Sequence, residues 1–448
     1  MLTLSVFGLR KAFASSLFAI SLLILSSVAA QATTIKEVVS PGGITAWLVE
    51  DHLNPIITMR FAFKGGAALD PDDRLGLSRL AASLMDEGAG DLDSQAFQRV
   101  LEDRSITLRY DSGLDSFRGR LVTLTKHADT AFGLLHDSLT TPRFDAEPVE
   151  RIRGQILSGL RQDEEDPQTQ ASRALFKHLY DGHPYSRPAD GTLESVAAIT
   201  QADLTAFTKR MLSKDALIVG VVGDVTPEAL GPLLDKAFGA LPETRNVGAV
   251  SDVKPNLDGS KLLIELDVPQ SAILFADQGL KRADPEFYAA YVMNYVLGSG
   301  GFTSRLYTEV REKRGLAYSV GSYLYPFDHS ALTLGQSGTQ TARVQETIDV
   351  IRAEWKRFAE DGITSSELDD AKLYLTGSYP LRFTDSSGIA QMLVGLQQDN
   401  LGPSYFDDRN AFIDAVTAED IKRVTARIID ENRLTFVIAG QTSGLKTQ

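Results

Sequence analysis

The sequence predicts an α+β protein built from two homologous domains that are joined by a linker. The chain has 448 residues, more than one hydrophobic core usually organises. Its second half repeats a pattern of its first, because AITQADL at 198–204 parallels AVTAEDI at 415–421. The same offset carries Gly223, after an apolar run, onto Gly440. Between the copies, residues 241–260 hold two prolines, two glycines and few large apolar groups, which is typical of a linker.

The composition of the chain argues against several kinds of binding partner and against cysteine chemistry. Hydrophobic residues make up 43% of the chain and charged residues 23%, as in globular proteins. The formal net charge of -14 argues against nucleic acid and against an anionic membrane surface as partners. The chain has no cysteine, which excludes a disulfide framework and thiolate chemistry.

Residues 1–32 have the pattern of a secretory signal peptide. Arg10 and Lys11 form a charged region, residues 12–28 are apolar, and small residues follow at Ala30 and Ala32, after which cleavage is expected. A retained membrane anchor is the alternative, although the apolar run is short for a span and no second long apolar run appears. Export without cysteines suits a bacterial periplasmic protein, with no membrane contact expected after cleavage.

Residues 33–242 are expected to form the N-terminal domain. Alternating and apolar runs predict strands at 44–49, 56–63, 106–110, 116–124 and 217–222. Apolar residues at helical spacing predict helices at 76–85, 95–103, 128–139 and 148–160. Ser94 is the expected cap of the second of these helices.

Residues 243–260 are the predicted linker, and residues 261–448 the C-terminal domain, which contains the most informative stretch of the chain. Residues 297–325 read LGSGGFTSRLYTEVREKRGLAYSVGSYLY. The spacing predicts a helix over 303–314, a turn at Gly315, where positive φ is expected, and a strand over 316–325. Arg311 then lies in the last turn of the helix and Tyr318 near the start of the strand. Taken alone, Arg311 would pair with a nearby carboxylate and Tyr318 would fill a sheet face.

This stretch resembles the C-terminal half of the pitrilysin/insulinase family of zinc metallopeptidases. The matching residues are Arg305-Leu306, Arg311-Glu312 and GLAYxV at 315–320, and a further turn, DGHPY at 181–185, is similar to a family turn. The resemblance covers nearly the whole mature chain. It implies two domains that each carry an antiparallel β-sheet backed by α-helices. It also implies that Arg311 and Tyr318 bind the substrate beside the scissile bond.

The metal-binding motif of that family is missing. Catalytic members carry His-x-x-Glu-His on the first helix of the N-terminal domain, two ligands to zinc and a general base. The corresponding positions here are Arg79, Ala82 and Ser83, and the distal segment 155–160 has no carboxylate for the third ligand. No two of the six histidines are three or four residues apart, although a histidine site assembled from distant segments stays open. We therefore expect no zinc and no other cofactor in this chain.

The resemblance implies a non-catalytic subunit of a two-chain zinc endopeptidase. A homologous partner with His-x-x-Glu-His would hold the zinc in a heterodimer, and this chain would supply Arg311 and Tyr318 to grip the peptide. No activity is expected from this chain alone. The alternative is an inactive scaffold, assembly or peptide-binding protein without a role in catalysis. A third hypothesis, a self-sufficient enzyme with an unrelated metal site, finds little support in the spacing of the histidines.

Overall fold

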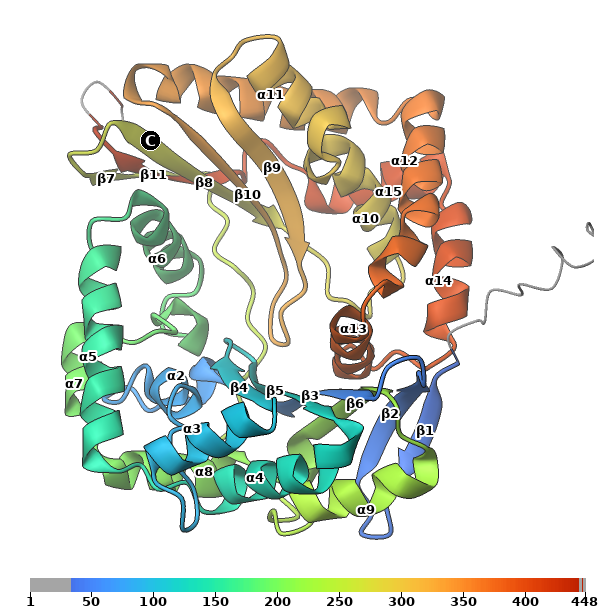
Figure 1. Cartoon of the computed structure of the whole chain (residues 1–448). Coiled ribbons are helices and arrows are strands. Elements are labelled where there is room, and N and C mark those ends of the chain that lie inside the picture. Colours follow the sequence, from blue (N-terminus) through green and yellow to red (C-terminus); the bar gives the residue numbers. More distant parts are fainter. Residues whose placement is uncertain (1–33, 443–444, 446–448) are drawn as a thin grey trace, which may run out of the picture.

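Two mixed β-sheets, each covered by helices, organise the chain. The computed structural model describes residues 34–442 and 445 (Figure 1). The predicted signal peptide, residues 1–32, lies outside the described residues. Within the described ranges, no helix is both long and apolar enough to cross a membrane.

The N-terminal half contains a six-stranded sheet in the order β1-β2-β6-β3-β5-β4. Its strands are β1 (Lys36–Val39), β2 (Thr45–Glu50), β3 (Ile56–Lys64), β4 (Thr107–Ser112), β5 (Ser116–Leu124) and β6 (Leu217–Gly223). Its helices are α2 (Leu77–Ala82), α3 (Ser94–Asp103), α4 (Ala128–Thr140), α5 (Ala146–Asp163), α6 (Pro167–Leu179), α7 (Leu193–Ala198), α8 (Gln201–Met211) and α9 (Pro227–Phe238).

The C-terminal half contains a five-stranded sheet in the order β7-β11-β8-β10-β9. Its strands are β7 (Lys261–Glu265), β8 (Gln270–Gln278), β9 (Ala317–Tyr325), β10 (Leu332–Gln340) and β11 (Thr435–Gly440). Its α-helices are α10 (Phe287–Asn294), α11 (Val344–Asp361), α12 (Ser365–Gly377), α13 (Ser386–Gln398), α14 (Tyr405–Asp414) and α15 (Ala418–Ile428). Two π-helical segments, η5 (Tyr295–Ser299) and η7 (Tyr307–Glu312), and a 3₁₀ turn, η6 (Gly301–Thr303), lie between α10 and β9.

The two halves repeat one topology, which confirms the predicted α+β class with two homologous units. Without β1, the N-terminal strand order matches that of the C-terminal sheet strand for strand. The repeated sequences start α8 and α15, where Thr200 and Thr417 form the same capping box with Asp203 and Asp420. Each sheet differs from the expected antiparallel form at one place, because β2 pairs with β6, and β7 with β11, in parallel.

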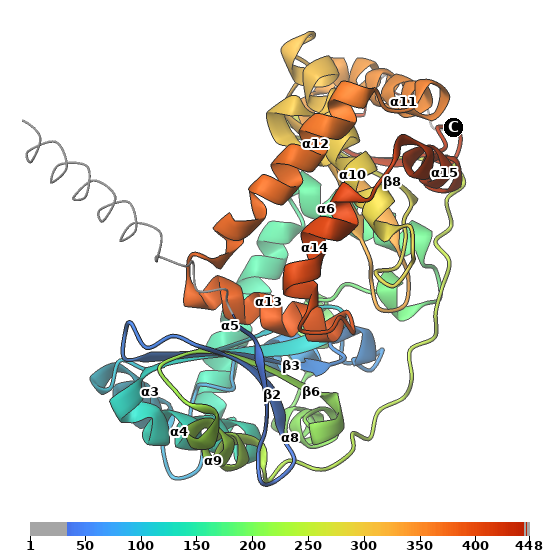
Figure 2. The ribbon, with the colours of Figure 1, turned by 90° about the vertical axis from the view of Figure 1, so that its right-hand side faces the viewer.

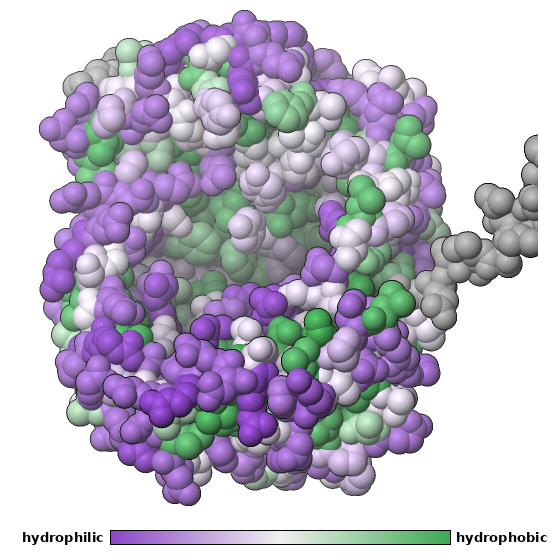
Figure 3. Space-filling view, viewed as in Figure 1, coloured by the Kyte–Doolittle hydropathy of each residue, from purple (hydrophilic) through white to green (hydrophobic). Residues whose placement is uncertain are grey.

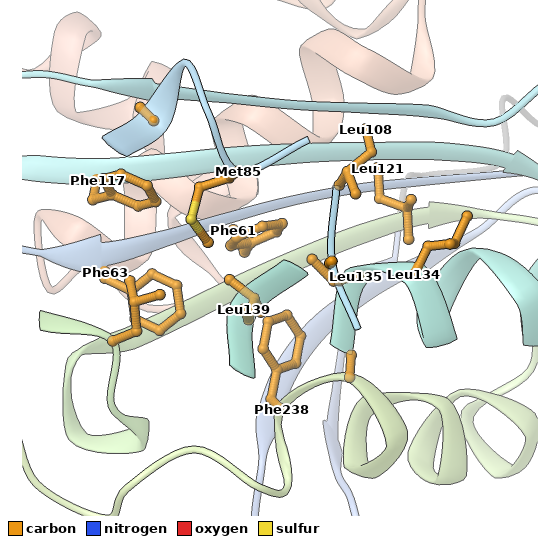
Figure 4. Close-up of a cluster of buried hydrophobic side chains, with 14 of the residues drawn as sticks. Phe61, Phe63, Met85, Leu108, Phe117, Leu121, Leu134, Leu135, Leu139 and Phe238 are labelled. Carbon is orange, nitrogen blue, oxygen red and sulfur yellow. The ribbon is translucent and has the colours of Figure 1, made fainter. Parts of the chain in front are cut away.

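The helices on the outer face of the N-terminal sheet bury its main core. Alternate residues of β3 and β5 point toward these helices, and Phe61 lies 5.5 Å from Phe238 of α9 between ring centroids. Figure 4 shows how this cluster gathers side chains from the sheet, from the turn after α2, from α4 and from α9: Phe61, Phe63, Met85, Leu108, Phe117, Leu121, Leu134, Leu135, Leu139 and Phe238. The C-terminal half has an equivalent core around Phe275, Trp355 and Phe436.

Each half also lends one helix to the inner face of the other half's sheet. Helix α13, from the C-terminal half, packs on β6 and β3 (Figure 2) and buries Trp47, Val49 and Val222 against Leu393. Gly220 permits this close approach, because a Cβ there would lie 2.8 Å from the Cβ of Leu393. Reciprocally, α6 packs on β8 and β11. Residues 241–260, which contain no helix or strand, run along one side of the molecule between the sheets.

Three predicted elements differ locally from the structure. The helix expected at 76–85 is shorter, because α2 ends at Ala82 and the Ser83 hydroxyl bonds the carbonyl of Arg79, 3.1 Å away. Asp93, and not Ser94, caps α3, since its carboxylate accepts from the amide of Ala96 at 2.8 Å. The segment expected as one helix at 303–314 is divided into η6 and the wider η7.

Candidate functional site

Arg311 and Tyr318 lie side by side, as the tight turn between η7 and β9 requires. The guanidinium carbon of Arg311 is 4.5 Å from the centroid of the Tyr318 ring and 4.8 Å from that of Tyr307. A nitrogen of Arg311 also donates to the Tyr307 hydroxyl. Among the described residues, no carboxylate forms an ion pair with Arg311, so the simple structural interpretation of this arginine does not hold. Its remaining donors are available to a ligand.

The turn that joins the two residues depends on Gly315. Its φ of +58° is left-handed, which glycine adopts without the steric cost of a Cβ. The amides of Gly315 and Leu316 donate to the carbonyls of Arg311 and Val310, both at 2.9 Å, and close the end of η7. Val310 is fully buried and fixes η7 on the core. This arrangement confirms the predicted positions of Arg311 and Tyr318 at the end of a helix and the start of a strand.

A β-bulge turns Tyr318 outward. Ala317 pairs with Thr339 and Val320 with Ser337, so Tyr318 and Ser319 together oppose the single residue Gly338. Ala317 and Val320 both point into the helix-side core, and the two bulged residues remain on the other face. Tyr318 is 81% exposed, and its hydroxyl makes no hydrogen bond with the described residues. The phenol therefore does not fill a sheet face and is free to donate to a ligand.

Aromatic residues that the sequence analysis did not single out complete this cluster. Phe302 is 72% exposed and packs edge-on against Tyr307, with ring centroids 4.9 Å apart. Tyr307 precedes Arg311 by four residues, which is the helical spacing that could have revealed the contact. The π-helical turn η7 widens the backbone at this point, a feature frequent at functional sites. We call Phe302, Tyr307, Arg311 and Tyr318 the Arg/Tyr cluster.

A partly buried ion pair holds the Arg/Tyr cluster on the helices behind it. Arg305 donates from Nε and Nη2 to the two carboxylate oxygens of Glu367, both at 2.7 Å, and from Nη2 to the carbonyl of Gly362. Burial opposes ionisation of Glu367, but the hydrogen bonds from Arg305 and Thr364 outweigh it and lower the pKa of Glu367 to about 2. The segment that leads into η7 is thereby fixed to the N-terminus of α12.

The degenerate motif on α2 does not fit a metal ion. Arg79 forms an ion pair with Asp190, Ala82 is buried in the core, and Ser83 bonds its own helix. A guanidinium and a methyl group are not zinc ligands, and α5 carries no carboxylate over residues 155–160. Within residues 34–442, no group of three histidine, cysteine, aspartate or glutamate side chains is placed to hold a metal ion.

Around this helix, the structure shows a buried carboxyl and a cavity at the junction of the two halves. Asp70 is 3% exposed and accepts from the amide and hydroxyl of Ser78 at 3.1 Å; burial raises the pKa of Asp70 to about 7. A cavity of about 600 Å³ lies beside Asp190. It is lined by residues of α6, of the segment 185–190 and by Phe327 from the β9–β10 hairpin.

The histidines take part in separate local contacts. His52 bonds Asp224 at 2.7 Å, His183 bonds the carbonyl of Ser251, and His178 bonds Asp258. Hydrogen bonding to Asp224, and then to Glu50, raises the pKa of His52. His183 and His329 both lie against the ring of Tyr185, but within residues 34–442 no group of three potential metal-binding side chains joins the histidines into one site.

Comparison with known proteins adds three findings. The family described as "Peptidase M16 inactive domain" matches residues 198–375. The "Non-peptidase homolog YmxG" of Helicobacter pylori is 30% identical over 370 residues, which is 82% of this chain and 84% of that protein. A crystal structure of a peptidase M16 inactive domain from Pseudomonas fluorescens has 27% identity and a TM-score of 0.86, covering 92% of this chain and 99% of the other.

A longer protein shares the fold. The crystal structure of the periplasmic protease PqqL from Escherichia coli has a TM-score of 0.77 and 15% identity. The match covers 92% of this chain but 46% of PqqL, so PqqL is long enough for two units of this size.

Proposed function

The chain belongs to the M16 peptidase family, the pitrilysin/insulinase family, as a member without the zinc motif, and from this we propose that it is the non-catalytic, substrate-binding subunit of a two-chain zinc endopeptidase. The observation that carries the proposal is the Arg/Tyr cluster. An arginine that has no carboxylate partner among the described residues and an exposed phenol lie in contact at a tight turn. A family member that served only as a structural component would not need both the Arg311 guanidinium and the exposed Tyr318 hydroxyl.

The two side chains have complementary tasks in this proposal. Arg311 offers several fixed donors to the carbonyl groups of an extended peptide. Tyr318 donates its hydroxyl proton to the oxygen on which negative charge develops during hydrolysis, where one aimed donor is worth about 2–4 kcal/mol. The partner's zinc supplies the hydrolytic chemistry. Stacking of Arg311 on Tyr307 and Tyr318 limits the rotamers of the arginine, so that less entropy is lost when a peptide binds.

The proposed partner is a homologous chain that carries His-x-x-Glu-His. The length of PqqL supports this arrangement, because the match covers 46% of PqqL and leaves room in that polypeptide for a second unit of this size. The description of PqqL as a periplasmic protease also supports the periplasm as the location of this chain. In the heterodimer, each chain would lack what the other provides: one holds the metal, and this one holds the peptide.

The alternative is a scaffold or peptide-binding protein without a role in catalysis. The relative named a non-peptidase homolog favours it as much as it favours the proposal, because both need a chain that does not cleave peptides by itself. The two functions differ in what happens to cleavage by the partner when the Arg/Tyr cluster is changed.

The deciding experiment assembles the complex from this chain and its catalytic partner and measures peptide cleavage. We expect Arg311→Ala and Tyr318→Phe to lower kcat/KM by about tenfold or more each, without loss of assembly in size-exclusion chromatography. Arg99→Ala and Tyr374→Phe are matched controls, because both residues are exposed and lie outside the cluster. Unchanged cleavage in both cluster variants would support the scaffold alternative.

A further inference from the structure

Three arginines stand in one row across the N-terminal sheet. Arg60 of β3 is directly opposite Arg120 of β5, and Arg120 is directly opposite Arg109 of β4. Residues in such register share one face of the sheet, and neighbouring strands lie about 4.8 Å apart. We call Arg60, Arg120 and Arg109 the arginine row.

The arginine row lies on the inner face of the sheet, beside the part of that face that α13 covers. Met59, Phe61 and Leu121 alternate with these arginines and belong to the outer, helix-covered core, so the row points the other way. On β6, the same row continues with Gly220, which α13 covers. Arg60 marks the border, since its Nη2 donates to the hydroxyl of Ser387 at the start of α13. The space-filling view shows the molecule hollowed between the two sheets (Figure 3).

The charges of the row are only partly balanced by the protein. Arg109 pairs with Asp86 at 2.6 Å. Arg120 has no ion pair or hydrogen bond with the described residues, and the Nε atoms of Arg60 and Arg120 are both buried without a partner. Burial, and then the charge of Arg120, lowers the pKa of Arg60. The next basic residue on this face, Arg118, pairs with Asp111 at 2.6 Å.

A row of like charges lowers the stability of the sheet, and acidic residues that could balance it are common in this sequence. Like charges directly opposite each other on adjacent strands are destabilising. The chain carries 59 acidic residues against 45 basic ones, yet none of the described carboxylates forms an ion pair with Arg60 or Arg120, and Asp111 and Asp385 act on Arg60 only from beyond ion-pair distance. Local features that cost stability are expected where they serve function. A ligand with negative charge would relieve the repulsion and supply the missing acceptors.

We propose that the arginine row binds the acidic side chains of a peptide that enters between the two sheets. The proposal rests on the proposed function, because it assigns a charge preference to the peptide that this chain holds. Carboxylates accept two parallel hydrogen bonds from one guanidinium, and the spacing of the row suits carboxylates about 5–10 Å apart. The opposite sheet offers Tyr323 and Tyr325 on β9, which are 47% and 45% exposed and can bond the backbone of the same peptide.

The test measures binding of three labelled peptides of equal length to the purified mature chain by fluorescence anisotropy. The peptides carry Glu, Gln or Lys at the same positions. We expect the Glu peptide to bind about tenfold or more tightly than the other two, and added salt to weaken this preference. The double variant R60Q/R120Q should lose the preference and keep its affinity for the Gln peptide.

Two further measurements separate a binding role from a structural one. Arg99→Gln removes one charge from exposed α3 and should leave the preference intact. Arg120→Gln should melt at the same temperature as the wild type or a higher one, since it removes a like-charge contact. A lower melting temperature with unchanged binding of the Glu peptide would make the row structural and overturn the proposal.

The remaining outcomes are equally decisive. Equal binding of the three peptides would overturn the charge preference, while the role of Arg311 and Tyr318, measured by cleavage in the complex, would stand. Inorganic phosphate that binds as tightly as the Glu peptide would show a simple anion site, which also overturns the proposal. Loss of cleavage in Arg311→Ala together with an intact Glu preference would support both.

Discussion

At the scale of single residues, the Arg/Tyr cluster positions an arginine by aromatic stacking instead of by an ion pair with a carboxylate. Arg311 is held by the faces of Tyr307 and Tyr318 and by one hydroxyl, and no carboxylate in the described part of the chain pairs with it. An ion-pair partner would compete with a peptide for the same donors. Aromatic stacking fixes the side chain and leaves its hydrogen-bond donors free.

Asp70 provides a residue-scale prediction about pH. Because burial raises the pKa of Asp70 to about 7 in the folded chain, the folded state binds more protons than the unfolded state between about pH 4 and pH 7. The contribution of Asp70 to the free energy of unfolding therefore falls as the pH rises through this window. Asp70→Asn keeps an acceptor for Ser78 but cannot ionise. We expect its free energy of unfolding, relative to the wild type, to rise by roughly 1–3 kcal/mol from acidic to neutral pH.

Urea denaturation over a pH series checks this prediction. Asp103→Asn, at the exposed end of α3, is the control, and its difference from the wild type should stay small throughout. A difference between Asp70→Asn and the wild type that does not change with pH would show that Asp70 does not ionise in this window.

At the scale of elements, the site depends on irregular backbone. Three irregular features follow one another over the twelve residues 307–318: the π-helical η7, the left-handed Gly315 and the start of the bulge at Tyr318. Each departs from ideal helix or strand, and together they direct Arg311 and Tyr318 to the same place. The Arg305–Glu367 pair holds this segment against α12.

Breaking that pair gives the element-scale prediction. Glu367→Gln removes the charge partner of Arg305, whose side chain is 11% exposed, and should lower the free energy of unfolding by about 1–3 kcal/mol at neutral pH. The pKa of Glu367 is lowered to about 2, so the stabilisation is present above its unfolded pKa and is lost as the pH falls toward 2. The difference between variant and wild type should therefore shrink in acid.

Thermal melting at several pH values measures this effect. Glu360→Gln breaks a pair with Lys356 in which both side chains are more than half exposed, and it should change the melting temperature little. If Glu367→Gln and Glu360→Gln melt alike at neutral pH, the Arg305–Glu367 pair does not fix η7.

At the scale of the whole molecule, the exchange of α6 and α13 joins the two halves into one structure. Each helix covers apolar strand residues that belong to the other half, such as Val222 under Leu393 and Leu274 under Leu175. Separation of the halves would expose both surfaces to water. The hydrophobic effect therefore opposes opening, and we expect the halves to stay together even when the linker is cut.

Cutting the linker tests this at the scale of the molecule. We expect a chain with a protease site inserted near Gly248 to remain one particle after cleavage in size-exclusion chromatography. The fragments 34–242 and 261–442, expressed separately, should aggregate, and they should copurify when expressed together. Two folded fragments that migrate apart after cleavage would show that the helix exchange does not hold the halves.

The sequence alone determined the family, the two-unit α+β class and the positions of Arg311 and Tyr318 on their elements. These features are local: a capping box, an apolar run ending in glycine, or a helix followed by Gly315 is specified by neighbouring residues. The loss of the metal motif was equally visible, because it is a matter of residue identity at three positions.

Only the tertiary structure decided the exchange of α6 and α13, the stacking of Phe302 and Tyr307 around Arg311, and the alignment of Arg60, Arg120 and Arg109. Alternation in each strand indicated which face a residue takes, but not which residues stand opposite one another. That depends on strand register and on helices from the other half, whose packing is set by contacts between segments hundreds of residues apart. The physical reason is that hydrophobic burial is non-directional, so a local pattern shows that a face must be covered without showing what covers it.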